Sequence, residues 1–244
     1  MIELTDGLSI SVLAAAATIG FVHTLLGPDH YLPFVTLARA QHWSLGRTLT
    51  TVAACGTAHV LGSAVLGGAG LALGAAIGSM EGVDAGRGSF AAWAMVLFGA
   101  CYGAWGVRQA WVAKAELTPH AHGDHVHIHR QGAHTHAHQH AHVDGQEPQA
   151  PPRTFWALLI LFIVGPCEPL IPLFVLPASR GRWDIAIATI AVFGVVTVAT
   201  MLAVTTVGFL GARKIQFGSA ERYAHAMAGG AVAVSGLMVI GLGL

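Results

Sequence analysis

Charged residues are scarce in this chain of 244 residues: Asp, Glu, Lys and Arg together make up 10% of it, while 54% of the residues are hydrophobic. A soluble domain carries about 25% charged residues. The shortage of charge therefore excludes an ordinary soluble domain and indicates an integral membrane protein. The formal net charge is zero, and no basic and aromatic cluster indicates a nucleic-acid partner.

Cysteine is also rare, and its number is odd: Cys55, Cys101 and Cys167 all fall in apolar segments. This excludes a disulfide framework. A Gly-x4-Gly-Lys-Ser/Thr phosphate loop is missing from the sequence, so the chain has no nucleotide site of that kind of its own. We expect a protein that is not an enzyme and that holds no permanently bound cofactor.

Long apolar segments are abundant. Six of them are long enough to cross about 30 Å of hydrocarbon, at residues 8–27, 48–76, 89–112, 154–178, 184–211 and 221–244. They predict an all-α integral membrane protein with six transmembrane helices. The glycines of the second segment predict close packing or a bend. The Gly-rich stretch that follows, with Glu81, Asp84 and Arg87, predicts an external turn with solvated charges.

Basic residues are distributed unevenly between the loops. Nine lie in the loops after the first, third and fifth segments and three in the others. Cytoplasmic loops collect Lys and Arg, so this bias predicts both termini outside. The first segment has no basic region before it and no cleavage site, so we expect it to be a retained span. The setting we expect is a bacterial inner membrane.

Two histidines and a carboxylate interrupt the first apolar segment, at His23, Asp29 and His30. Ionisable groups at membrane depth are costly and usually mark a pathway or a ligand site. On an unbroken helix the histidines would be roughly 10 Å apart, too far for one metal ion. Gly27 and Pro28 predict a helix break that folds the three side chains towards one point.

A similar interruption occurs in the second half, where residues 165–175 resemble residues 27–35 in outline. The match pairs Asp29 with Cys167 and His30 with Glu168. It predicts two three-helix halves, and an odd number of crossings in each would make them inverted repeats whose corresponding Gly-Pro breaks flank a midplane site.

These halves divide the chain into a first membrane repeat at 1–114, a loop at 115–153 and a second membrane repeat at 154–244.

Three further residues are candidate ligands. His59 lies within the apolar second segment and needs either a polar partner or a metal. Glu168 can bind metal or carry a coupled proton, and Cys167 is a candidate soft ligand that would favour copper or zinc over nickel. His42 and His225 are predicted to be interfacial.

The loop at 115–153 is a histidine-rich tract. Its composition predicts adaptable, weakly selective binding of transition metals on the cytoplasmic side, with an incidental disordered linker as the alternative. Its histidines are His120, His122, His125, His127, His129, His134, His136, His138, His140 and His142.

These motifs resemble those of the nickel/cobalt transporter superfamily. The pattern His-x5-Asp-His at 23–30 is one residue longer than the family's His-x4-Asp-His, and Gly27-Pro28-Asp29-His30 is similar to the urease-accessory membrane-protein branch. The region of Ala58, His59 and Ser63, the run 165–169 and the His-rich loop are similar to further parts of the superfamily. The resemblance implies movement of Ni²⁺ or Co²⁺ without an ATPase. We also expect Zn²⁺ as a further substrate and a cytoplasmic metallochaperone as a partner.

Three other functions remain open at this point. A thiol-redox carrier needs a second cysteine opposite Cys167, where this sequence has Asp29. An anion exporter of the sulfite type needs a basic site. A metal-sensing or storage protein would use the His-rich loop alone. The sequence favours a secondary transporter whose midplane ligands are His23, Asp29, His30, His59, Glu168 and Cys167.

Overall fold

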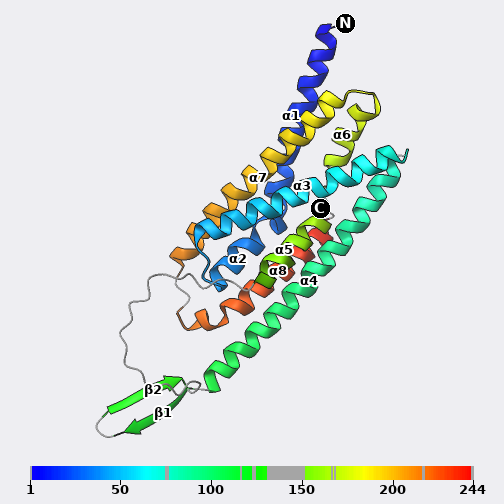
Figure 1. Ribbon diagram of the computed structural model, residues 1–244. Helices are drawn as coiled ribbons and strands as arrows, with labels where there is room; N and C mark the ends of the chain where they lie inside the picture. Colours follow the sequence, from blue (N-terminus) through cyan, green and yellow to red (C-terminus); the bar gives the residue numbers. More distant parts are fainter. Residues whose placement is uncertain are drawn as a thin grey trace.

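The computed structural model describes residues 2–74, 77–115, 117–122, 125–130, 152–165, 167, 169–215 and 218–242. Within these ranges the chain is a helical bundle with one two-stranded hairpin (Figure 1). In chain order the elements are α1 (Ile2–Leu26), η1 (Pro28–His30), α2 (Leu32–Ala40), α3 (Leu45–Ala72), α4 (Ile77–Ala115), β1 (Leu117–His122), β2 (His125–Arg130), α5 (Pro152–Val164), α6 (Leu170–Ser179), α7 (Trp183–Lys214), η2 (Gly218–Tyr223) and α8 (Ala224–Leu242).

Five helices in the described part of the chain are long and apolar enough to cross a membrane, which is the character of an integral membrane protein. They are Ser9–Leu26, Leu45–Ala72, Ala85–Val112, Trp183–Lys214 and Ala220–Leu242. The segment predicted as a fourth span, 154–178, is instead two shorter apolar helices, α5 and α6. Large apolar side chains are exposed on the outer faces of the bundle, among them Val65, Leu97, Val195 and Val207.

The predicted break in the first segment is present. α1 ends at Leu26 because Pro28 has no backbone N–H to continue the hydrogen-bond ladder and because the residue before a proline disfavours helical angles. Gly27 accordingly has φ −82° and ψ 100°, and the short helix η1 begins at Pro28. α2 then begins at Leu32. The polar residues of the motif therefore lie on or beside a non-helical joint.

The prediction for residues 81–87 was wrong. Residues 77–115 form one helix, α4, so Arg87 lies on a helix and not in a turn. Its Nη2 donates a hydrogen bond of 2.9 Å to the carbonyl of Ile163, in the last turn of α5. In the second segment, where close packing or a bend was expected, α3 is continuous from Leu45 to Ala72 and its glycines pack closely: a Cβ on Gly67 would lie 2.5 Å from the ring of Phe174.

Glycines set the closest contact between helices, which joins α4 to α8. A Cβ built on Gly229 of α8 would lie 2.5 Å from the Cα of Gly103 and 2.6 Å from the carbonyl oxygen of Gly99. Small residues at such spacing let two helix backbones touch within a membrane. The backbones of α4 and α8 are thereby held directly against each other.

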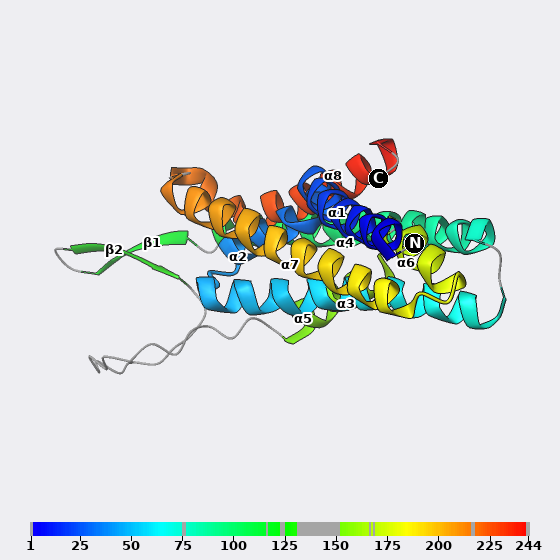
Figure 2. The same cartoon turned by 90° about the horizontal axis from the view of Figure 1, so that it is seen from above.

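The remaining helices pack across the sequence halves. α1 lies along α7, and α5 lies along α3, while α2 contacts both α7 and α8 (Figures 1 and 2). Two buried apolar clusters result. One contains Phe34, Val52 and Phe162, and the other contains Val60, Cys167 and Phe193. The joint after α1 therefore lies in the interior, beside residues from α3 and α5.

The first part of the His-rich tract forms an antiparallel hairpin at the far end of α4 (Figure 1). Its register pairs His120 with His127 and His122 with His125. These strands were not predicted from the sequence. A two-stranded hairpin by itself is only marginally stable in water.

The glycine contact between α4 and α8 can be tested with adjacent residues. Gly229→Ala would place a methyl group against the backbone of α4, and overpacking of this kind typically costs about 1–3 kcal/mol. Gly230→Ala is the control, because a Cβ there meets nothing within 4 Å. Thermal unfolding in detergent should show a lower midpoint for Gly229→Ala only, and equal midpoints would contradict the packing described.

Candidate metal centre

Three histidines from three elements meet at the joint. His23 lies in the last turn of α1, His30 ends η1, and His59 lies within α3. The ring centroids of His23 and His30 are 4.9 Å apart, and those of His30 and His59 are 5.2 Å apart. His30 and His59 are almost completely buried. The break therefore brings together the residues that an unbroken helix would separate.

Hydrogen bonds determine which ring nitrogen carries the proton in two of these imidazoles. His59 Nδ1 lies 3.3 Å from the carbonyl oxygen of Phe162, and His30 Nδ1 lies 3.2 Å from the carbonyl oxygen of Gly27. A carbonyl oxygen can only accept, so each Nδ1 must donate. The proton of the neutral ring is then on Nδ1, and Nε2 keeps its lone pair. This is the tautomer in which Nε2 can bind a metal.

The Nε2 atoms of all three histidines are buried, and within the described residues they have no hydrogen-bond partner. Each such atom costs about 1–3 kcal/mol when it is left unsatisfied. A metal ion would satisfy several lone pairs at once, because neutral imidazole is a common ligand of zinc, copper, iron and nickel. The unsatisfied nitrogens are therefore the strongest chemical signal in the structure.

A small cavity of about 50 Å³ adjoins these rings. It is lined by His23, Gly27, Asp29, His30, His59, Gly88, Ala91, Ala92, Met95, Leu161, Phe162, Gly165 and Val239. In this measure of volume, one water molecule needs about 10–15 Å³. The space therefore has room for a single ion together with bound water.

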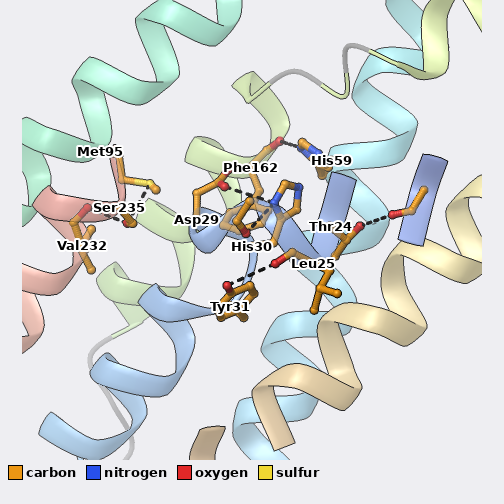
Figure 3. A network of polar contacts seen from close by, with 12 residues as sticks. Thr24, Leu25, Asp29, His30, Tyr31, His59, Met95, Phe162, Val232 and Ser235 are labelled. Carbon is orange, nitrogen blue, oxygen red and sulfur yellow. Dashed lines mark hydrogen bonds and ion pairs between the residues drawn. The ribbon is translucent and has the colours of Figure 1, made fainter. Parts of the chain in front are cut away.

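Asp29 orients His30 and brings a negative charge to the cavity. Its Oδ1 lies 3.2 Å from Nδ1 of His30, and its side chain is 26% exposed (Figure 3). A carboxylate that accepts from the second ring nitrogen makes the imidazole a better ligand. Gly27 is required in this arrangement, because a Cβ there would lie 2.5 Å from His30 Nδ1 and 2.8 Å from Asp29 Oδ1.

Cys167 lies close to His23 and His59. One ligand atom each from these three residues can be chosen so that all lie within 4.8 Å of one another. Cys167 is completely buried, between α5 and α6. Glu168, its predicted companion, lies outside the described residues.

The remaining predicted metal ligands are the histidines of the His-rich loop. His134, His136, His138, His140 and His142 lie outside the described residues, whereas His120, His122, His125, His127 and His129 lie on the hairpin. His225 is half-buried at the start of α8, where Nδ1 is 2.8 Å from the hydroxyl of Tyr102. His42 is exposed in the turn after α2.

Comparison with known proteins adds no neighbour to this picture. No protein-family model, curated protein or solved structure matches the chain. The chemistry of the centre therefore has to be judged from its own geometry.

The carbonyl of Phe162, which selects the His59 tautomer, is a functional group of the centre that was not predicted from the sequence. Every residue has a carbonyl, so no sequence signal could have identified this one.

The steric role of Gly27 gives a direct test. Gly27→Ala should displace the His30 ring and lower metal affinity about 10–100-fold, the range seen when groups that support metal ligands are removed. Gly68→Ala on α3 is the control, since a Cβ there meets nothing within 4 Å. Calorimetric titration with Zn²⁺, on protein lacking residues 118–147, would measure both, and an unchanged affinity for Gly27→Ala would contradict the site.

Proposed function

We propose that this chain is a secondary transporter of divalent transition metal ions and that the ion passes through the centre formed by His23, His30 and His59. The observation that carries the proposal is a set of three buried Nε2 atoms that have no partner in the described part of the chain and that lie beside a small cavity inside an apolar helical bundle. Ionisable groups in such a position usually mark an ion pathway. A purely structural role would leave these nitrogens unsatisfied.

The proposal includes six membrane crossings arranged as two inverted repeats. In this reading α1 with α2 forms one discontinuous crossing, and α5 with α6 forms its counterpart. The packing supports this arrangement, because equivalent helices of the two repeats make equivalent contacts. α1 packs on α7, and its counterpart α5 packs on α3. Likewise α2 contacts α7 and α8, and its counterpart α6 contacts α3 and α4. Inverted repeats of this kind place the substrate between discontinuous helices near the bilayer midplane.

The ends of the discontinuous helices suit a cation. The last turn of α5 carries the negative end of its helix dipole towards the cavity, through Leu161 and Phe162. Movement of the repeats relative to each other would open this centre to one side of the membrane and then to the other. No nucleotide is needed for such a cycle.

The nickel/cobalt transporter resemblance supplies Ni²⁺ and Co²⁺ as the first substrates to test. The proposal keeps both termini outside a bacterial inner membrane, with the His-rich loop in the cytoplasm. There the loop would gather or buffer metal and could exchange it with a metallochaperone. The loop and the buried centre are separate sites, with different residues.

The alternatives fit the centre less well. Of the described residues that line the cavity, none is Lys or Arg, which disfavours an anion exporter. A thiol-redox carrier needs a second thiol, whereas the group found beside Cys167 contains His23 and His59. A sensor or store that uses only the loop would leave the buried histidines without a role.

Flux through proteoliposomes of known orientation tests the proposal. Wild-type protein should accumulate radioactive nickel or cobalt, His30→Ala should reduce the flux to background, and deletion of 118–147 should only lower it. His42→Asn is the control: His42 is an exposed histidine with φ 53°, a conformation that Asn tolerates.

Two outcomes would contradict this proposal. If wild-type protein moves nickel, cobalt and zinc no faster than empty liposomes, the transport function is wrong. If the loop deletion abolishes metal binding while His30→Ala leaves it intact, the protein is a sensor or store.

A further inference from the structure

Cys167 is held in place by the first half of the chain. Its backbone N–H donates a 2.9 Å hydrogen bond to the hydroxyl of Ser63 on α3. Ser63 is completely buried and lies one helical turn after His59. The same helix therefore provides an imidazole of the centre and the anchor of the cysteine.

The three candidate atoms are close to a coordinating arrangement. In a tetrahedral site with metal–nitrogen bonds of about 2.0 Å and metal–sulfur bonds of about 2.3 Å, neighbouring ligand atoms are about 3.5 Å apart. The chosen atoms of His23, His59 and Cys167 lie within 4.8 Å of one another. A contraction of roughly 1 Å would complete the geometry, which rotation of side chains can provide.

Charge favours a thiolate in this position. A divalent ion in an apolar interior is costly unless nearby negative charges balance it. Asp29 provides one such charge beside the cavity. Cys167 provides a second when its sulfur loses a proton, and the two together neutralise a divalent ion.

We propose that Cys167 is a thiolate ligand of the transported ion, together with His23 and His59, and that the centre therefore favours a thiophilic, tetrahedral ion such as Zn²⁺ over Ni²⁺. This inference rests on the proposed function and names its substrate class. Thiolates select zinc and copper(I), whereas nickel(II) prefers square-planar nitrogen and oxygen ligands. His30 is not one of these three ligands; its ring lies beside that of His59, with 5.2 Å between the ring centroids.

The binding step balances in charge and atoms. The Cys167 S–H bond breaks as the sulfur–metal bond forms, and the proton leaves to water. No oxidation occurs. Metal binding by a thiol releases a proton in this way. Binding of each ion through Cys167 therefore releases one proton to water.

Co²⁺ is the probe that tests the thiolate in the full-length protein. A thiolate bound to Co²⁺ gives a charge-transfer band in the near ultraviolet, which imidazole and carboxylate ligands do not give. The His-rich loop contains no cysteine, so Co²⁺ bound there is silent in this band. The band should be present in wild-type protein and absent in Cys167→Ser.

Two other cysteines serve as matched controls. Cys55 is buried one turn before His59 on α3, and Cys101 is exposed on α4. Cys55→Ser and Cys101→Ser should both keep the band. A band that disappears with Cys55→Ser and survives Cys167→Ser would overturn the assignment.

Flux measurements separate this inference from the proposed function. In competition assays the preference for Zn²⁺ over Ni²⁺ should fall about tenfold or more in Cys167→Ser. Cys167→Asp provides a second variant, since a carboxylate replaces the thiolate charge; it should lose the band and retain more Co²⁺ flux than Cys167→Ser. Metal flux without a charge-transfer band in the wild type would refute the thiolate and leave transport standing, whereas loss of both would refute both.

Discussion

The structure depends on the cost of placing imidazole nitrogens where water is scarce. An apolar bundle tolerates His30 and His59 only because their Nδ1 atoms donate to the carbonyls of Gly27 and Phe162. Those two bonds leave the opposite nitrogens without partners among the described residues. The fold therefore gives Nδ1 of each ring a hydrogen-bond acceptor and leaves Nε2 for a ligand.

That arrangement requires a broken first helix and a glycine before the break. Pro28 stops the hydrogen-bond ladder of α1, and Gly27 leaves room for the His30 ring and the Asp29 carboxylate. In the second half, α5 ends at Val164, so that its last carbonyls can accept from His59 and Arg87. Each break thus exposes backbone groups that a continuous helix would have used internally.

The sequence predicted the membrane class and the break after His23, because apolar run length and Gly-Pro pairs act locally. It also identified His23, His30 and His59, since a histidine within an apolar run is conspicuous by itself. It placed Arg87 in a turn because glycines around it lowered helix propensity, yet packing kept the helix intact. The carbonyl that accepts from His59 is brought into place by the packing of α5 against α3, which no local pattern encodes.

The glycine contact between α4 and α8 has a mechanical consequence. Helices that touch through their backbones can rotate slightly about the contact, but they cannot separate without losing it. Gly103 and Gly229 therefore form a point about which α4 and α8 can turn but not part. In Figure 1 α7 lies at the opposite edge of the bundle from α4, with α1 packed on it. The cavity beside His23 is lined by Met95 of α4 and Val239 of α8, so a small turn at the glycines would change the shape of that cavity.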